Sequence, residues 1–200
     1  MTAADETYGP ISRRERRYWW LCLVALVVLI PLSFIVTNRL HLENLAQARE
    51  FFVTEILSGE SESYAGARWK LEAYRAITDS PDPRFKWPED RALVLVRLSA
   101  SLTRDAGESW LICGLTLVDG EGRRWDPLRL TLTNDIEKLI APDGIVAPGC
   151  STVAFSQPKM GTNVVMDEKF VVPKEALATL SARFSVVSER PWALSFPLKH

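Results

Sequence analysis

Apolar side chains dominate one continuous stretch near the N-terminus, from Trp19 to Val36, and no charged residue lies between Tyr18 and Asn38. An α-helix rises about 1.5 Å per residue, so this stretch covers roughly 30 Å, the thickness of a hydrocarbon core. The pattern therefore predicts one membrane-spanning helix over residues 18–38.

Arginines crowd the N-terminal flank of this stretch: Arg13, Arg14, Arg16 and Arg17 precede it, whereas Arg39 alone follows it closely. Basic residues that flank a span stay on the cytoplasmic side of the membrane. We therefore expect residues 1–17 to form a cytoplasmic tail. Everything after the span should lie outside, in a periplasm or at a cell surface.

A cleaved signal peptide would show a similar apolar stretch. The small-residue pattern of such a cleavage site occurs at Ala46-Gln47-Ala48, well beyond the apolar stretch. That distance favours a retained anchor in a single-pass membrane protein.

Residues 37–57 continue with apolar positions three and four residues apart, which is the spacing of one helix face. These positions are Leu42, Leu45, Phe52 and Ile56, and Phe51 adds a further aromatic ring. We expect a juxtamembrane helix and linker over residues 39–65. Its apolar residues form a self-association seam, contact a neighbouring membrane protein, or pack against the chain's own outer domain.

Short apolar runs separated by turn residues fill the rest of the chain, and several alternate with the period of two that is typical of strands. The predicted strands cover residues 68–78, 92–103, 110–118, 128–133, 150–156, 169–172, 182–188 and 192–198. A hairpin turn is expected at residues 119–122, and single helical turns at 135–139 and 174–180. The pattern predicts a mainly β fold, an antiparallel sandwich over residues 66–200.

The proline-rich loop before the second strand carries two aromatic residues, Phe85 and Trp87. They either cap one end of the core or form an exposed aromatic patch that binds a protein or glycan partner.

Composition narrows the functional classes. From Thr37 onward the chain has 20 Lys and Arg against 22 Asp and Glu, so it lacks the basic surface that nucleic-acid binding requires. The only histidines are His41 and His200, which leaves no catalytic triad and no zinc motif. The acidic turn at residues 119–122 lacks the spacing of a calcium loop. We expect no enzyme activity, cofactor or metal.

Three cysteines are present. Cys22 lies in the predicted span, whereas Cys113 and Cys150 lie in the predicted outer domain. An oxidising compartment would permit a disulfide between these two, worth about 4 kcal/mol in the chain-entropy model. Two free buried thiols are the alternative.

Four segments resemble secreted or membrane-anchored bacterial immunoglobulin-like domains of largely unknown function. They are the strand over residues 93–102, the hairpin over 115–125, the Pro-Gly strand over 148–155 and the Phe-Val-Val-Pro segment at 170–173. The resemblance covers residues 66–198. It implies an immunoglobulin-like sandwich that binds or scaffolds, without catalytic residues.

Two functions remain. The first is a single-pass protein that presents a non-catalytic β-sandwich to a partner in the cell envelope. The second is an accessory subunit of a transport or secretion complex, docked through its transmembrane and juxtamembrane helices. A curved-sheet α+β domain is an alternative fold, because a helix precedes the strands.

Overall fold

The computed structural model describes residues 13–48, 50–79, 88–128 and 134–198, and side chains are not described at 13, 40–48, 108 and 134–136. The chain divides into two units, Met1–Leu45 and Ala46–His200. The first contains nearly all of one helix, and the second is a β domain.

Helix α1 spans Arg13–Ala48 and includes Pro31. Its segment Arg14–Arg39 is long and apolar enough to cross a membrane. None of its most apolar window is buried inside the described part of the protein.

The prediction of a helix up to residue 57 was wrong in its second half. Helix α1 ends at Ala48, and strand β1 occupies Phe52–Glu55. The sequence Phe-Val-Thr is rich in aromatic and β-branched residues, which favour a strand over a helix. The predicted linker up to residue 65 is wrong as well, because strand β2 occupies Ser61–Tyr64 and pairs with the next strand. The β domain therefore begins well before the predicted boundary at residue 66.

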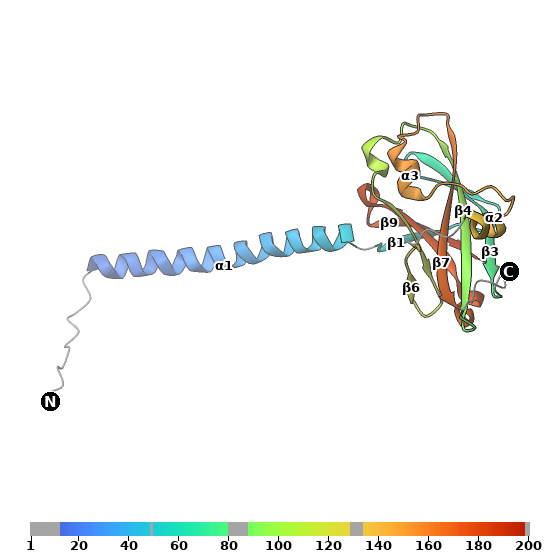
Figure 1. Cartoon of the computed structure of the whole chain (residues 1–200). Helices are drawn as coiled ribbons and strands as arrows, with labels where there is room; N and C mark the ends of the chain where they lie inside the picture. The colour runs from blue at the N-terminus through green and yellow to red at the C-terminus, as the bar shows by residue number, and fades with distance from the viewer. Residues whose placement is uncertain (1–12, 49, 80–87, 129–133, 199–200) are drawn as a thin grey trace. The chain divides into compact units, whose positions relative to one another are not determined.

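Two sheets form the β domain (Figure 1). The five-stranded sheet has the order β1-β9-β8-β5-β6, and the four-stranded sheet has the order β2-β3-β4-β7. The bounds of the remaining strands are β2 Ser61–Tyr64, β3 Ala67–Ile77, β4 Arg91–Leu102, β5 Cys113–Val118, β6 Arg124–Trp125, β7 Asn163–Pro173, β8 Ser181–Val186 and β9 Trp192–Pro197. All described strand pairs are antiparallel except β1 with β9, which is parallel.

The core lies between the two sheets and contains side chains from both. Its largest fully buried members are Trp69, Trp110, Phe170, Phe184 and Phe196. The rings of Trp69 and Phe184 lie 4.0 Å apart and join the two sheets. Burying such rings dominates the stability of a domain of this size.

Strand β4 is buried on both faces. One face enters the core, and the other packs Leu93 and Leu95 against Ile140 of helix α2, which spans Asn134–Ile140. Figure 1 shows α2 beside this sheet. The sequence predicts a helical turn at this position and a strand at β4. It does not predict that α2 covers the outer face of β4.

The predicted strand over residues 150–156 is wrong. Helix α3 occupies Cys150–Phe155, with Val153 and Ala154 buried and Phe155 74% exposed. Apolar residues three and four apart fit one helix face as well as strand alternation does, and a segment this short leaves the two indistinguishable.

The other predicted strands and turns agree with the structure to within a few residues, with two differences. Residues Gly107–Trp110 form a 3-10 helix (η1) instead of the start of a strand. Strand β7 begins at Asn163, six residues before the predicted start. The helical turn predicted at 174–180 is the 3-10 helix η2, Lys174–Thr179. The predicted strand 128–133 lies almost wholly outside the described residues.

Candidate interaction surface at the start of the β domain

The first strand of the β domain is held by the last. The main-chain N–H groups of Phe51 and Phe52 both donate to the carbonyl of Pro191, at 2.9 and 3.1 Å. The rings of Phe52 and Trp192 stack with their centroids 4.6 Å apart and their planes at 28°. Segments at opposite ends of the β domain therefore build one aromatic surface.

Phe51, Phe52 and Trp192 remain 55%, 52% and 55% exposed. We call these three residues the aromatic entry surface, because the chain enters the β domain here from α1. Large aromatic side chains are enriched at protein interfaces, where burying their rings contributes strongly to affinity. The main-chain bonds and the ring stack fix the positions of Phe52 and Trp192.

Tyr64 of strand β2 links this surface to the other sheet. Its hydroxyl donates to the carbonyl of Trp192 at 2.8 Å and accepts from the N–H of Val186 at 3.1 Å. Burial raises the pKa of this phenol, although the hydrogen bond from Val186 opposes the shift. The hydroxyl therefore stays protonated and can donate at neutral pH.

A polar hollow of about 290 Å³ adjoins Tyr64 at the turn between β2 and β3. We call it the turn hollow. It is lined by Ser63, Tyr64, Ala65, Gly66, Ala67, Thr103, Arg104 and Glu189. Across it, Arg104 and Glu189 form an ion pair at 3.0 Å. Apolar rings beside a charged polar rim are typical of a binding surface.

The turn itself is strongly constrained. Ala65 and Gly66 both adopt positive φ, 50° and 77°. The indole N–H groups of Trp69 and Trp110 hold the turn by donating to the carbonyls of Tyr64 and Ala65, each at 2.8 Å. A side chain at residue 66 would collide with Arg104, whose Nε would lie 2.2 Å from the added Cβ. The positive φ favours glycine at this position, and any larger residue would require the Arg104 side chain to move.

Glu50 anchors the entry segment on the outer face of the five-stranded sheet. Its carboxylate accepts from the hydroxyl of Ser185 at 2.6 Å and pairs with Arg124 at 3.3 Å and Arg183 at 4.0 Å. The Glu50 side chain is only 5% exposed. Burial, together with the neighbouring charge of Arg124, lowers the pKa of Arg183. The carboxylate therefore compensates two guanidinium groups that lie close to each other.

The predicted interaction residues separate in the structure. Phe51 and Phe52 belong to the aromatic entry surface, whereas Ile56 is buried in the core instead of lying on a helix face. The side chains of Leu42 and Leu45, and all of Phe85 and Trp87, lie outside what the structure describes. The predicted stripe was wrong as a unit because the chain changes from helix to strand within it.

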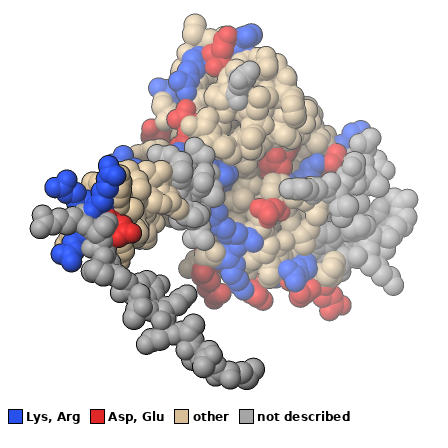
Figure 2. Space-filling model, turned by 90° about the vertical axis from the view of Figure 1, so that its left-hand side faces the viewer, with Lys and Arg blue, Asp and Glu red and all other residues tan. Residues whose placement is uncertain are grey.

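The arginines predicted to set orientation all lie in α1. Arg14, Arg16 and Arg17 are exposed, and the side chain of Arg13 is outside the described set. Figure 2 shows basic side chains around the N-terminal end of the helix with one acidic group. Over the face of the β domain in the same view, basic and acidic groups are interspersed.

Cys113 and Cys150 are joined by a disulfide, with their Cα atoms 6.1 Å apart. The bond connects the start of β5 to the start of α3. It fixes this helix beside the sandwich core, and the main-chain N–H of Cys150 also donates to Glu168 at 2.8 Å.

A buried ionic network on the outer face of the four-stranded sheet has no signal in the sequence. Arg97 donates through Nε and Nη2 to both oxygens of Asp167, each at 2.7 Å, and through Nη1 to Asp143 at 2.9 Å. Nη2 also donates to the carbonyl of Ile145. The network fastens the loop after α2 to strands β4 and β7, so we assign it a structural role.

Asp119, in the acidic turn, has no free oxygen for a metal. Its carboxylate accepts from the N–H groups of Glu121 and Arg123, at 3.0 and 2.9 Å, and pairs with the Arg123 guanidinium at 2.6 Å. Among the residues that the structure describes, no group of three or more His, Cys, Asp or Glu side chains is arranged to hold a metal ion.

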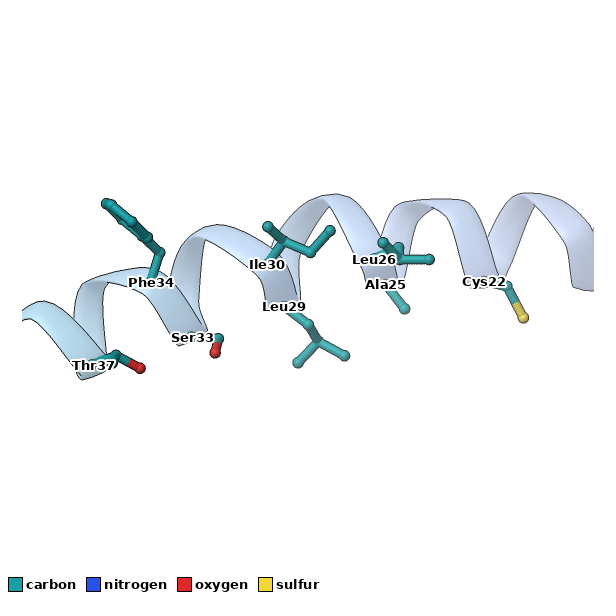
Figure 3. Close-up of a pocket in the computed structure, with 8 residues that line it drawn as sticks. All are labelled: Cys22, Ala25, Leu26, Leu29, Ile30, Ser33, Phe34 and Thr37. Atoms are coloured by element: carbon teal, nitrogen blue, oxygen red, sulfur yellow. The ribbon is translucent and has the colours of Figure 1, made fainter.

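One face of α1 carries a shallow hollow among Cys22, Ala25, Leu26, Leu29, Ile30, Ser33, Phe34 and Thr37. Figure 3 shows the small side chains of Cys22, Ala25 and Ser33 on the same side of the helix, with the larger Leu29 between Ala25 and Ser33. Small residues on a helix face favour close approach of a neighbouring helix.

No protein-family model matches the chain, and no curated protein matches it by sequence. Three solved structures are similar in outline. An uncharacterized β-sandwich protein from Clostridium difficile is 7% identical and covers 73% of this chain and 94% of its own, with a TM-score of 0.43. A conserved hypothetical protein from Bacillus anthracis is 12% identical, with coverages of 72% and 94% and a TM-score of 0.41. The yjhA protein from Bacillus subtilis is 10% identical, with coverages of 70% and 97% and a TM-score of 0.42. Similarities this distant assign no function.

Proposed function

We propose that this chain is a single-pass membrane protein that holds a non-catalytic β-sandwich outside the membrane and binds an envelope protein through the aromatic entry surface. The observation that carries the proposal is the continuity of three features. Helix α1, whose apolar segment Arg14–Arg39 is exposed, ends at Ala48, Glu50 is fastened to the β domain, and half-exposed rings follow at Phe51 and Phe52.

Orientation follows from charge in this proposal. The basic residues before the span hold the N-terminus in the cytoplasm, so the β domain lies in a periplasm or at a cell surface. A disulfide between Cys113 and Cys150 suits that compartment, because cytosolic reductants remove such bonds. Lipid contacts α1, and a protein partner contacts the β domain.

The immunoglobulin-like assignment is part of the proposal. Two packed sheets with mostly antiparallel pairing support it. The five-stranded sheet also contains one parallel pair, β1 with β9, and helix α3 lies between β6 and β7 in the sequence. Function therefore rests on the surface and not on the fold class.

The test uses the full chain in its native membranes. Wild type, a Phe52→Ser/Trp192→Ser variant and a Phe155→Ser control are cross-linked, and the captured polypeptide is identified. Phe155 is a matched control because it is an exposed phenylalanine on α3, outside the aromatic entry surface. Loss of one specific partner in the double variant, with retention in the control, supports the proposal. Equal capture by all three chains contradicts it.

A second candidate is an accessory subunit that docks through α1. The small side chains on one face of that helix favour it (Figure 3). It ranks second because lipid-facing helices also carry such residues. Replacing residues 19–36 by an unrelated apolar span separates the two: partner capture that survives the replacement contradicts docking through the helix.

A further inference from the structure

Strand β1 forms one edge of the five-stranded sheet, and β9 is the only strand that pairs with it among the described residues. All four of its residues are exposed. An edge strand of this kind presents main-chain donors and acceptors that a further strand can pair with.

The register identifies these groups. Phe52 donates its N–H to Pro191 and Ile56 donates to Ser195, both toward β9. Main-chain groups alternate in direction along a strand, so those of Val53 and Glu55 point away from β9. Each of these residues offers one N–H and one carbonyl on the open side.

We propose that an extended segment of a partner polypeptide adds to this edge, pairing with Val53 and Glu55 while its apolar side chains contact the aromatic entry surface. This inference rests on the proposed function and specifies the form of its partner. In strand addition the main-chain bonds supply affinity, and side-chain contacts supply specificity. The rings of Phe52 and Trp192 supply such contacts.

The length of helix α1 argues against lipid as the molecule that covers the edge of β1. Helix α1 continues for the ten residues 39–48 beyond Asn38, a rise of about 15 Å. The headgroup layer on each side of a bilayer is only about 6 Å thick. The helix therefore extends past this layer before Phe51 is reached.

The small surface area that self-pairing would bury argues against a second copy of the chain as the partner of β1. Self-pairing through β1 joins only Phe52–Glu55 of each copy. A stable interface buries about 1,200 Å² or more, which two four-residue strands do not provide. A free extended segment can instead continue past β1 along the neighbouring rings.

The test compares Val53→Pro with Val53→Ala in the full chain, with a photo-reactive residue at position 51 and native membranes as the source of partner. Proline removes the outward N–H of residue 53 and leaves the bonds to β9, whereas alanine keeps that N–H. We expect Val53→Pro to lower the yield of cross-linked partner by about tenfold relative to Val53→Ala, at equal thermal stability. The cross-linked peptide should map to an alternating apolar segment.

A second measurement needs no variant. Amide exchange at Val53 and Glu55 should be at least about tenfold slower in native membranes than in the purified chain, with no change at Thr54. Equal exchange, equal cross-linking in the two variants, or a product made only of lipid or of a second copy overturns the inference. If Phe52→Ser/Trp192→Ser abolishes capture but Val53→Pro does not, the proposed function stands and strand addition fails. If neither abolishes capture, both fail.

Discussion

The carboxylate of Glu50 accepts a 2.6 Å hydrogen bond from the hydroxyl of Ser185, across 135 residues of sequence. Glu50 lies two residues beyond the end of α1, so this bond fixes the path of the chain as it enters the β domain. Charge pairing with Arg124 and Arg183 strengthens the attachment.

Replacing Glu50 by alanine should lower the free energy of unfolding by about 2 kcal/mol, since buried donors lose their acceptor. Thermal denaturation of the full chain in detergent measures the loss. Glu60→Ala is the control, because Glu60 is an exposed carboxylate. Equal melting temperatures for the two variants would show that the Glu50 attachment contributes no stability.

Replacing Arg97 by methionine should destabilise the β domain by about 3–5 kcal/mol. The side chain of Asp167 is fully buried, and without Arg97 its charge loses its principal partner. Chemical denaturation provides the measurement. Lys70→Met serves as the comparison, because its ion pair with Glu72 is solvent-exposed and should contribute little. A loss no larger than that of Lys70→Met would contradict this role for the network.

Replacing both Cys113 and Cys150 by serine should cost about 4 kcal/mol, the chain-entropy value for cross-linking residues 37 apart. The double substitution should lower the melting temperature, and reducing the disulfide of the wild-type chain should lower it by the same amount. Cys22→Ser should change neither result, because that residue is a free cysteine in α1. A reductant-insensitive melting temperature would argue against the bond.

Glu168→Gln should stabilise the β domain at neutral pH. Burial raises the pKa of Glu168, despite the hydrogen bond from Cys150 and the charge of Lys169. The folded state therefore favours the protonated form. In the wild type, Glu168 does not lower the free energy of unfolding at pH values below its pKa in the unfolded chain. It lowers the free energy of unfolding progressively as the pH rises through the raised pKa of the folded chain. Glutamine carries no charge and can still accept the hydrogen bond.

Melting curves of wild type and Glu168→Gln at pH 4 and pH 8 test this pH dependence. The advantage of the variant should be present at pH 8 and absent at pH 4. An advantage of the same size at both pH values would show that ionisation of Glu168 is not its cause.

Changing Arg13, Arg14, Arg16 and Arg17 to glutamate should disturb the orientation of the chain, because in the proposed topology these basic residues hold the N-terminal flank in the cytoplasm. A tag at His200 reports which side the C-terminus occupies, through labelling of intact and permeabilised cells. Glutamate at Arg68 and Arg75, in the β domain, is the control. Unchanged labelling after all four changes would refute the charge argument.

The features that the sequence predicts well are those encoded locally. Alternation along residues 92–103 predicts β4, and the glycine-rich turn predicts the hairpin of β5 with β6, because each pattern needs only neighbours along the chain. The candidate cysteine pair could be named because only two cysteines follow the span.

Features that depend on distant partners could not be predicted. Phe52 reads equally as part of a helix stripe or a strand, and its pairing with β9 decides between them. Trp192 follows a proline and gives no sign that it stacks on a ring 140 residues earlier. Glu50 is one carboxylate among many until Ser185 is brought to it. The aromatic entry surface is thus a product of tertiary structure.

The parallel ladder between β1 and β9 also constrains the order of assembly. During synthesis, Phe52–Glu55 is completed long before Trp192–Pro197. Their contacts span nearly the whole β domain, so loop closure makes them slow to form. Until β9 has been synthesised, β1 lacks the strand that pairs with it. A chaperone that covers this short aromatic strand would protect the nascent protein from aggregation.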